Sequence, residues 1–215
     1  LRSVMGVNLK PGKLFNAKNI QGALRTLNKE DYIQGAISIS KDPETDKTKL
    51  ELKVKDRFPW RFDVAWDDFG RDYSGRQRAT MILGMDNLTG FGDKVYGGAV
   101  LSSRSQGILA GYSIPIGPWG TKLSYDYNFS NVNLGGPYKD LGIKGNAQSH
   151  LFTITQPLYR SATTDVIAHV GLDLPSSKTT MDDFNEDLSN YRLRVLRVGV
   201  DTLRDDKYGR WLAGI

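Results

Sequence analysis

Cysteine is absent from this 215-residue chain, and so is any long run of apolar residues. Without cysteine, the chain can form no disulfide scaffold and can use no thiolate as a nucleophile or metal ligand. No window approaches the ~18 consecutive apolar residues that a membrane-spanning helix requires. The sequence therefore excludes a helical membrane protein. It does not exclude a transmembrane β-barrel, whose strands alternate apolar and polar residues and so have ordinary hydropathy.

Histidine is scarce, because His150 and His169 are the only two in the chain. A hydrolase needs a serine or threonine beside a histidine that a third polar group orients. His150 directly follows Ser149 and so points to the opposite face of a strand, and the sequence offers no obvious partner for His169. No Gly-x-Ser-x-Gly turn occurs, and the acidic stretch 181–187 lacks the spacing and glycine of a calcium loop. We therefore expect no enzyme, no cofactor and no metal site, with an outer-membrane barrel enzyme as the least favoured alternative.

Positive charge is in small excess, with 29 Lys and Arg against 24 Asp and Glu. The basic residues are dispersed and mostly alternate with apolar ones, which is typical of solvated or lumen-facing positions rather than of a phosphate-binding patch. We expect no nucleic-acid partner.

Glycine and tyrosine are plentiful, and the first 58 residues differ from the rest. Asn16 can cap a helix whose apolar positions Ile20, Leu24 and Leu27 recur at helical spacing. Two strands follow, over 33–40 and 49–55, and the second alternates apolar with charged residues. The pattern predicts a small α+β unit.

From Pro59 onward the chain alternates apolar and polar residues in successive strands of about ten residues, the length that crosses a bilayer when tilted. The alternation is clearest where Trp60, Phe62, Val64 and Trp66 share one face. We expect about eight strands, at 60–66, 78–85, 93–102, 106–114, 122–130, 147–156, 166–173 and 190–200. The last slips phase near Leu196, where we expect a bulge.

The predicted connections alternate in length, with compact turns at 86–90, 115–120 and 159–164 and long polar loops at 131–144 and 175–188. Short turns on one side and long loops on the other are typical of an outer-membrane barrel. Aromatic residues near the strand ends would lie at the bilayer interface; these are Trp60, Trp66, Tyr112, Trp119 and Tyr159. The alternative is a soluble β-sandwich, which also alternates.

The order of the motifs resembles the outer-membrane transporters of two-partner secretion, the hemolysin-activator and filamentous-hemagglutinin type. Residues 19–28, Asn-Ile-Gln-Gly-Ala-Leu-Arg-Thr-Leu-Asn, resemble the helix of a polypeptide-transport-associated (POTRA) domain. Residues 68–76, Asp-Phe-Gly-Arg-Asp-Tyr-Ser-Gly-Arg, are similar to the first hairpin loop of the family's barrel. Residues 86–93 resemble the turn after the second barrel strand, and residues 111–117 the end of the fourth.

The resemblance implies a mainly β fold with two parts. Residues 1–58 would be a POTRA-like periplasmic domain, incomplete at its start, and residues 59–215 the N-terminal half of an outer-membrane β-barrel of about sixteen strands. Because no signal peptide opens the chain, we expect a fragment. The implied function is export of an unfolded exoprotein across the outer membrane, as in hemolysin or adhesin activation, with that exoprotein and outer-membrane lipid as partners. The alternative within the same superfamily is a factor that inserts other barrels.

Two sets of candidate functional residues follow. An exposed strand edge in the POTRA-like unit could bind the client by strand addition, beside Ile20, Leu24, Arg25, Ile37 and Ile39. Basic residues cost about 2–4 kcal/mol on the lipid face at mid-membrane and acidic ones somewhat less, so we place in the lumen Arg61, Asp63, Arg78, Lys122, Asp126 and Asp173. Arg192 and Arg194 could bind lipid phosphate near the rim or pair with lumen carboxylates.

Overall fold

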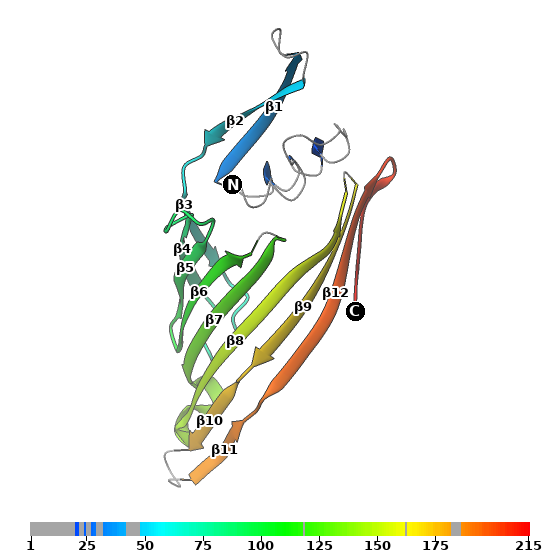
Figure 1. The fold of residues 1–215 in the computed structure, drawn as a ribbon. Helices are drawn as coiled ribbons and strands as arrows, with labels where there is room; N and C mark the ends of the chain where they lie inside the picture. The colour runs from blue at the N-terminus through cyan, green and yellow to red at the C-terminus, as the bar shows by residue number, and fades with distance from the viewer. Residues whose placement is uncertain are drawn as a thin grey trace.

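The structure is a computed structural model, and it describes residues 20, 21, 24, 27, 28, 32–41, 48–117, 119–161, 163–181 and 186–215. It contains two antiparallel sheets (Figure 1). The first pairs β1 (Ile33–Lys41) with β2 (Thr48–Asp56). The second is formed by β3 (Trp60–Asp67), β4 (Arg78–Asp86), β5 (Lys94–Ser102), β6 (Ser105–Ile116), β7 (Thr121–Asn133), β8 (Ile143–Arg160), β9 (Thr164–Asp173), β10 (Ser176–Met181), β11 (Glu186–Arg192), β12 (Val195–Asp206) and β13 (Gly209–Gly214). Within the described residues, no helix is long and apolar enough to span a membrane.

The N-terminal part has a small apolar core. Helical backbone occurs at residues 20, 21, 24, 27 and 28. Ile20, Leu27 and Ile33 are buried. The side chain of Asn28 donates a hydrogen bond to the Gly35 carbonyl (3.1 Å) and accepts one from the Gly35 N–H (2.6 Å). Leu27 fills the space that a Cβ at Gly35 would occupy. A glycine at this position therefore lets the helix lie directly on β1.

The large sheet is a series of hairpins in the order β13-β12-β9-β8-β7-β6-β5-β4-β3, with every neighbour antiparallel. It curves as it runs from β3 to β12 (Figure 1). Strands β10 and β11 form a further hairpin on the extended end of β8, at the end of the sheet farthest from β1 and β2.

Burial in the large sheet is the reverse of that in a soluble protein. Trp60 and Val170 are 46% and 45% exposed, and among its described residues no apolar side chain larger than glycine is buried. The buried charged side chains are carboxylates, namely Asp86, Asp93, Asp165 and Asp173. A β-sandwich requires a dry core between two packed sheets, so the sandwich alternative is wrong.

Of the two predicted long loops, 131–144 is shorter than predicted and 175–188 is mostly strand. In the segment 131–144, β7 continues to Asn133, a 3-10 helix spans Gly136–Leu141, and β8 starts at Ile143. In the segment 175–188, β10 pairs with β8 and β11. The loop prediction for 175–188 was wrong because a hairpin with both faces in water needs no apolar alternation, and backbone pairing alone sustains it. The predicted bulge near Leu196 is also absent: β12 pairs with β9 without a register shift, and the register shifts lie between β8 and β9 and between β10 and β11.

The turn between β4 and β5 is built around Asp93, whose side chain is fully buried. It accepts hydrogen bonds from the Thr89 N–H (3.0 Å), the Thr89 hydroxyl (2.8 Å) and the Tyr112 hydroxyl (3.2 Å). Burial alone would raise the pKa of Asp93, but these donors outweigh it and hold the pKa below its usual range. Gly92 adopts a positive φ of 85°, and a Cβ there would lie 2.7 Å from the Tyr32 hydroxyl. The turn therefore also receives a side chain of the N-terminal part.

We expect Asp93→Asn to weaken the acid sensitivity of the fold. Because the pKa of Asp93 is lower in the folded protein than in the unfolded chain, its charge stabilises the fold above about pH 4, and this contribution is lost as the pH falls through the folded pKa. The urea midpoint of the wild type in lipid vesicles should thus fall more steeply below about pH 4 than that of Asp93→Asn. Asp140→Asn, at an exposed position, is the control; equal acid profiles for Asp93→Asn and wild type would contradict the role of this turn.

Candidate functional site

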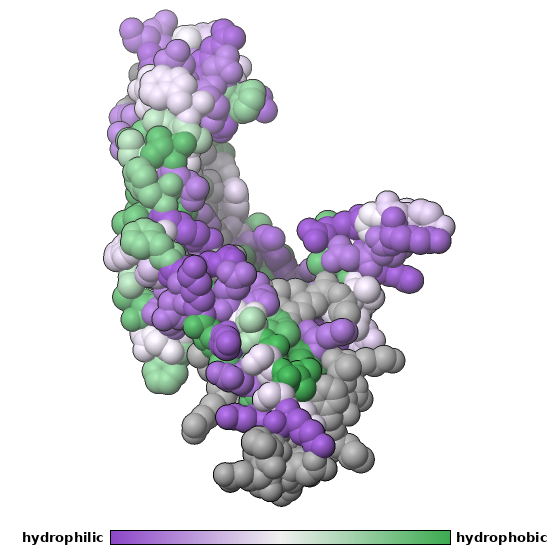
Figure 2. All heavy atoms as spheres, turned by 90° about the horizontal axis from the view of Figure 1, so that it is seen from above, coloured by the Kyte–Doolittle hydropathy of each residue, from purple (hydrophilic) through white to green (hydrophobic). Residues whose placement is uncertain are grey.

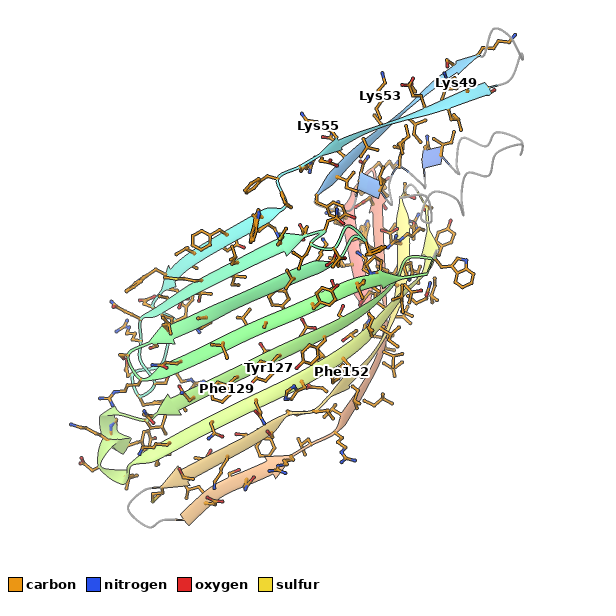
Figure 3. The ribbon with its side chains drawn as sticks, turned by 60° about the vertical axis from the view of Figure 1, so that its left-hand side comes forward. Lys49, Lys53, Lys55, Tyr127, Phe129 and Phe152 are labelled. Carbon is orange, nitrogen blue, oxygen red and sulfur yellow. The ribbon has the colours of Figure 1, made fainter. Side chains whose placement is uncertain are left out.

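One face of the large sheet carries a band of apolar residues that crosses eight strands. The strand register places one residue from each of eight strands in a single line across it. That line is Trp60, Met85, Val95, Tyr112, Tyr125, Phe152, Leu172 and Leu196. We call this side the apolar face; Tyr127, Phe129 and Phe152 belong to it on β7 and β8 (Figure 3). In the view from above, hydrophobic side chains gather along the outer, left-hand side of the molecule (Figure 2).

The apolar stretch moves along the strands as it crosses the sheet. On β3 it extends to Trp66, but the line of residues paired across from Trp66 reaches Gln106 on β6 and Asn131 on β7. On β12 the apolar stretch runs the other way, to Val198 and Val200. Lines of paired residues run perpendicular to the strands. Because the apolar band runs obliquely to these lines, the strands are tilted relative to the band. Tilted strands with an apolar band are the geometry of a membrane barrel.

The opposite face, which we call the polar face, carries all six residues predicted for the lumen: Arg61, Asp63, Arg78, Lys122, Asp126 and Asp173. The structure brings some of them together with partners that the sequence did not indicate. Arg78 pairs with Asp67 at 2.8 Å. Asp173 is buried and accepts hydrogen bonds from Ser149 and Arg197 on the two strands beside it.

Three long side chains on this face cross a glycine of a neighbouring strand to reach a carboxylate. The Tyr96 hydroxyl donates to Asp126 (2.5 Å) across Gly111, where a Cβ would lie 2.3 Å from the tyrosine ring. Arg61 passes Gly84 to approach Asp86 at 3.5 Å, and His169 passes Gly199 to approach Asp201 at 3.3 Å. We call these contacts glycine bridges. Sequence reasoning missed them because their ends lie on different strands; a glycine on the polar face is the one local indication.

The connection between β3 and β4 folds over the polar face. The Gly135 N–H donates to the Tyr73 carbonyl (2.8 Å), and Gly75 leaves no room for a Cβ beside Ser102. Tyr73 and Tyr138 meet edge to face, with ring centroids 5.8 Å apart. A cavity of about 580 Å³ lies between this connection and β5 to β8. The β3–β4 connection therefore narrows the space over the polar face at the end of the sheet away from β1.

The residues predicted for the client groove are distributed differently. Ile20 is buried, Leu24 and Ile37 are half-buried, and Ile39 is 54% exposed; Arg25 lies outside the described residues. Among the described residues β1 pairs with β2 alone, so its other edge has no strand partner there.

One face of the β1–β2 hairpin carries a row of lysines. Lys49, Lys53 and Lys55 alternate with the apolar residues of β2 and point away from the large sheet (Figure 3). The hairpin therefore has one apolar and one charged face.

The histidines have partners but no catalytic arrangement. His150 Nδ1 lies 2.9 Å from the Tyr125 hydroxyl on the apolar face, whereas His169 lies on the polar face beside Asp201. Ser149 donates to Asp173 rather than to either histidine. No group of three possible metal-binding His, Cys, Asp or Glu residues occurs in the part of the chain that the structure describes.

A tilted antiparallel sheet with an apolar outer band and a polar inner face defines an outer-membrane β-barrel protein. The model of the haemolysin secretion/activation protein ShlB/FhaC/HecB family matches residues 46–215, and the chain belongs to this family. Its location is the bacterial outer membrane.

Individual relatives agree with this membership. The chain is 23% identical to the outer membrane transporter CdiB of Dickeya dadantii over 163 residues, which cover 72% of this chain and 29% of that protein. It is 25% identical to the heme/hemopexin transporter protein HuxB of Haemophilus influenzae over 183 residues, covering 82% and 31%. The structure of CdiB from Escherichia coli shares the fold with a TM-score of 0.79 at 19% identity, over 100% of this chain and 41% of that one. The chain thus spans less than a third of the length of the curated relatives that it matches.

We expect Gly111→Ala to destabilise the sheet, because a methyl group there collides with Tyr96 and Asp126 and breaks their bridge. A lost buried hydrogen bond and overpacking together cost about 1–3 kcal/mol. Guanidinium unfolding in detergent measures the loss. Gly97→Ala is the matched control, since the nearest atom to its Cβ would be 3.9 Å away. If Gly111→Ala costs as much in a Tyr96→Ala background as in the wild type, the bridge is not the cause.

Proposed function

We propose that this chain comprises the client-binding domain and the first part of the barrel of an outer-membrane transporter that secretes a separately made polypeptide. The observation that carries the proposal is the sheet with an apolar outer band and a charged inner face, in a chain of the ShlB/FhaC/HecB family. The family match favours secretion over the insertion of other barrels.

Residues 1–58 act, in this proposal, as a POTRA-like periplasmic domain, and residues 59–215 as the first part of the barrel. The helix packed on β1 and the two-strand sheet support this division, as do the separate sheets on either side of residues 57–59. The connections 87–93, 117–120, 161–163 and 207–208 lie at the end nearest β1, and the two longest connections of the large sheet, 68–77 and 134–142, lie at the opposite end. Short turns face the periplasm in bacterial barrels, which orients the chain.

The client would bind by adding a strand to the open edge of β1. Backbone hydrogen bonds give such binding its affinity without regard to sequence, and exposed side chains of the strand add selectivity. Ile39 and half-buried Ile37 supply an apolar surface beside that edge. Ile20 is buried in the helix–strand core, so its part in binding would be to support the helix.

The polar face would line the path of the unfolded client. Carboxylates and guanidinium groups there are held by ion pairs and hydrogen bonds: Arg197 with Asp173, Arg78 with Asp67, and Tyr96 with Asp126. Paired charges keep the wall hydrated without a strong net field, so an extended polypeptide meets a surface to which apolar segments do not adhere.

No catalytic or cofactor role is part of the proposal. The named relatives are transporters. The energy for export would come from the folding of the client outside the cell.

We expect Ile39→Glu to reduce secretion, because a charge beside the β1 edge opposes docking of an apolar client segment. The readout is the protein in the culture medium that disappears when the gene is deleted and returns with the wild-type gene. Ser40→Glu is the matched control, since it adds the same charge one residue along, on the other face of β1.

Outer-membrane levels of both variants are measured alongside, to separate binding from folding. Equal secretion by the two variants at equal levels would reject the β1 edge as the client site. A deletion that removes no protein from the medium would reject the secretion function itself.

A further inference from the structure

The outer surface beyond the apolar band is basic at one end of the sheet. Strand pairing runs from Phe129 through Gln148 and Ser176 to Arg192, so Arg192 lies on the same side as the apolar face. This line ends on the β10–β11 hairpin, which lies at the end of the sheet farthest from β1 (Figure 1).

Charge changes abruptly at this line. From it toward the other end, the apolar-face positions of β8, β9 and β12 hold no Asp, Glu, Lys or Arg until Arg204. On the far side of it the first charged outward positions are basic, Lys178 and then Lys144. Asp187 is bound to Lys178 at 3.0 Å. On the apolar face, the side chains therefore change from uncharged to cationic within two residues of Arg192.

Arg192 and Arg194 are exposed and form no ion pair with a residue that the structure describes. Leu196 follows them on the apolar face, 69% exposed. Two guanidinium groups at the margin of an apolar band, without protein carboxylates, are complementary to phosphate, which a guanidinium binds with two parallel N–H donors.

We propose that Arg192 and Arg194 bind the phosphate of a phosphorylated glycolipid headgroup in the outer leaflet. The inference rests on the proposed orientation, which places β10 and β11 at the extracellular side. A lipid fits better than a soluble anion because its acyl chains lie along Leu196 and Val198 on the same face while its phosphate meets the cations. Arg192 ends β11, and Arg194 lies in the two-residue connection between β11 and β12.

The test uses lipopolysaccharide as the probe. The intact protein is purified from outer membranes in mild detergent, and lipopolysaccharide phosphate retained per protein is measured after exchange into phospholipid vesicles with and without added lipopolysaccharide. We expect retention to fall about fivefold for each cation removed in Arg192→Gln and Arg194→Gln, the scale of a single basic contact at a charged membrane surface. Arg192→Lys should retain part of the binding, because it keeps the charge and loses the bidentate geometry.

Arg204→Gln is the matched control. Arg204 faces outward at the other end of β12, where it lies opposite Trp211 of β13 in the strand register. Retention that falls with Arg204→Gln and not with Arg192→Gln would overturn the proposal and reverse the orientation. Equal retention by all variants would reject the site. Displacement of the lipid by millimolar inorganic phosphate would show a free-phosphate site and overturn the lipid assignment. Secretion, measured separately, distinguishes these outcomes from a failure of the transport function.

Discussion

Hydrocarbon outside and water inside is the constraint on which this structure depends. In water, a sheet with Trp60, Phe62 and Val64 exposed on one side would lose the free energy that apolar burial provides, about 25 cal/mol per Å². In a bilayer the same side chains are solvated by lipid, and closed backbone pairing becomes the requirement, since an unpaired N–H or C=O in lipid costs several kcal/mol. The long antiparallel ladder from β3 to β13 meets that requirement along its length.

Cohesion on the polar face comes from hydrogen bonds in place of an apolar core. In each glycine bridge a long side chain lies over a glycine of the neighbouring strand. Tyr96 reaches Asp126 on the strand beyond, whereas Arg61 and His169 approach a carboxylate on the same strand as the glycine. Asp86, which Arg61 approaches, and Asp173, which accepts hydrogen bonds from Ser149 and Arg197, are buried among polar neighbours and not in an apolar core. The same contacts pin the register, because a slip by one residue would bring a Cβ where each glycine now lies.

The N-terminal hairpin and the sheet meet at the β4–β5 turn. Tyr32 approaches Gly92, and the Arg57 N–H donates to the Tyr32 carbonyl (2.9 Å) beside the start of the large sheet. The Asp86 N–H in turn donates to the Pro59 carbonyl (2.9 Å). These contacts join the strand with the open edge to the end of the sheet where the compact turns lie, so that binding at β1 and passage along the polar face are neighbouring events in the proposed function.

The sequence by itself determined which side of each strand would be apolar, because the period of two in a strand is a local property that no tertiary contact alters. It therefore predicted the faces of Trp60, Arg61, Lys122 and Asp173 and most compact turns. Only the tertiary structure decided which residues meet. Tyr96 and Asp126 are 30 residues apart and touch across a third strand, and β10 and β11 form because β8 offers them a backbone edge although their side chains are polar. Pairing partners depend on register between distant segments, and backbone hydrogen bonds leave no trace in side-chain alternation.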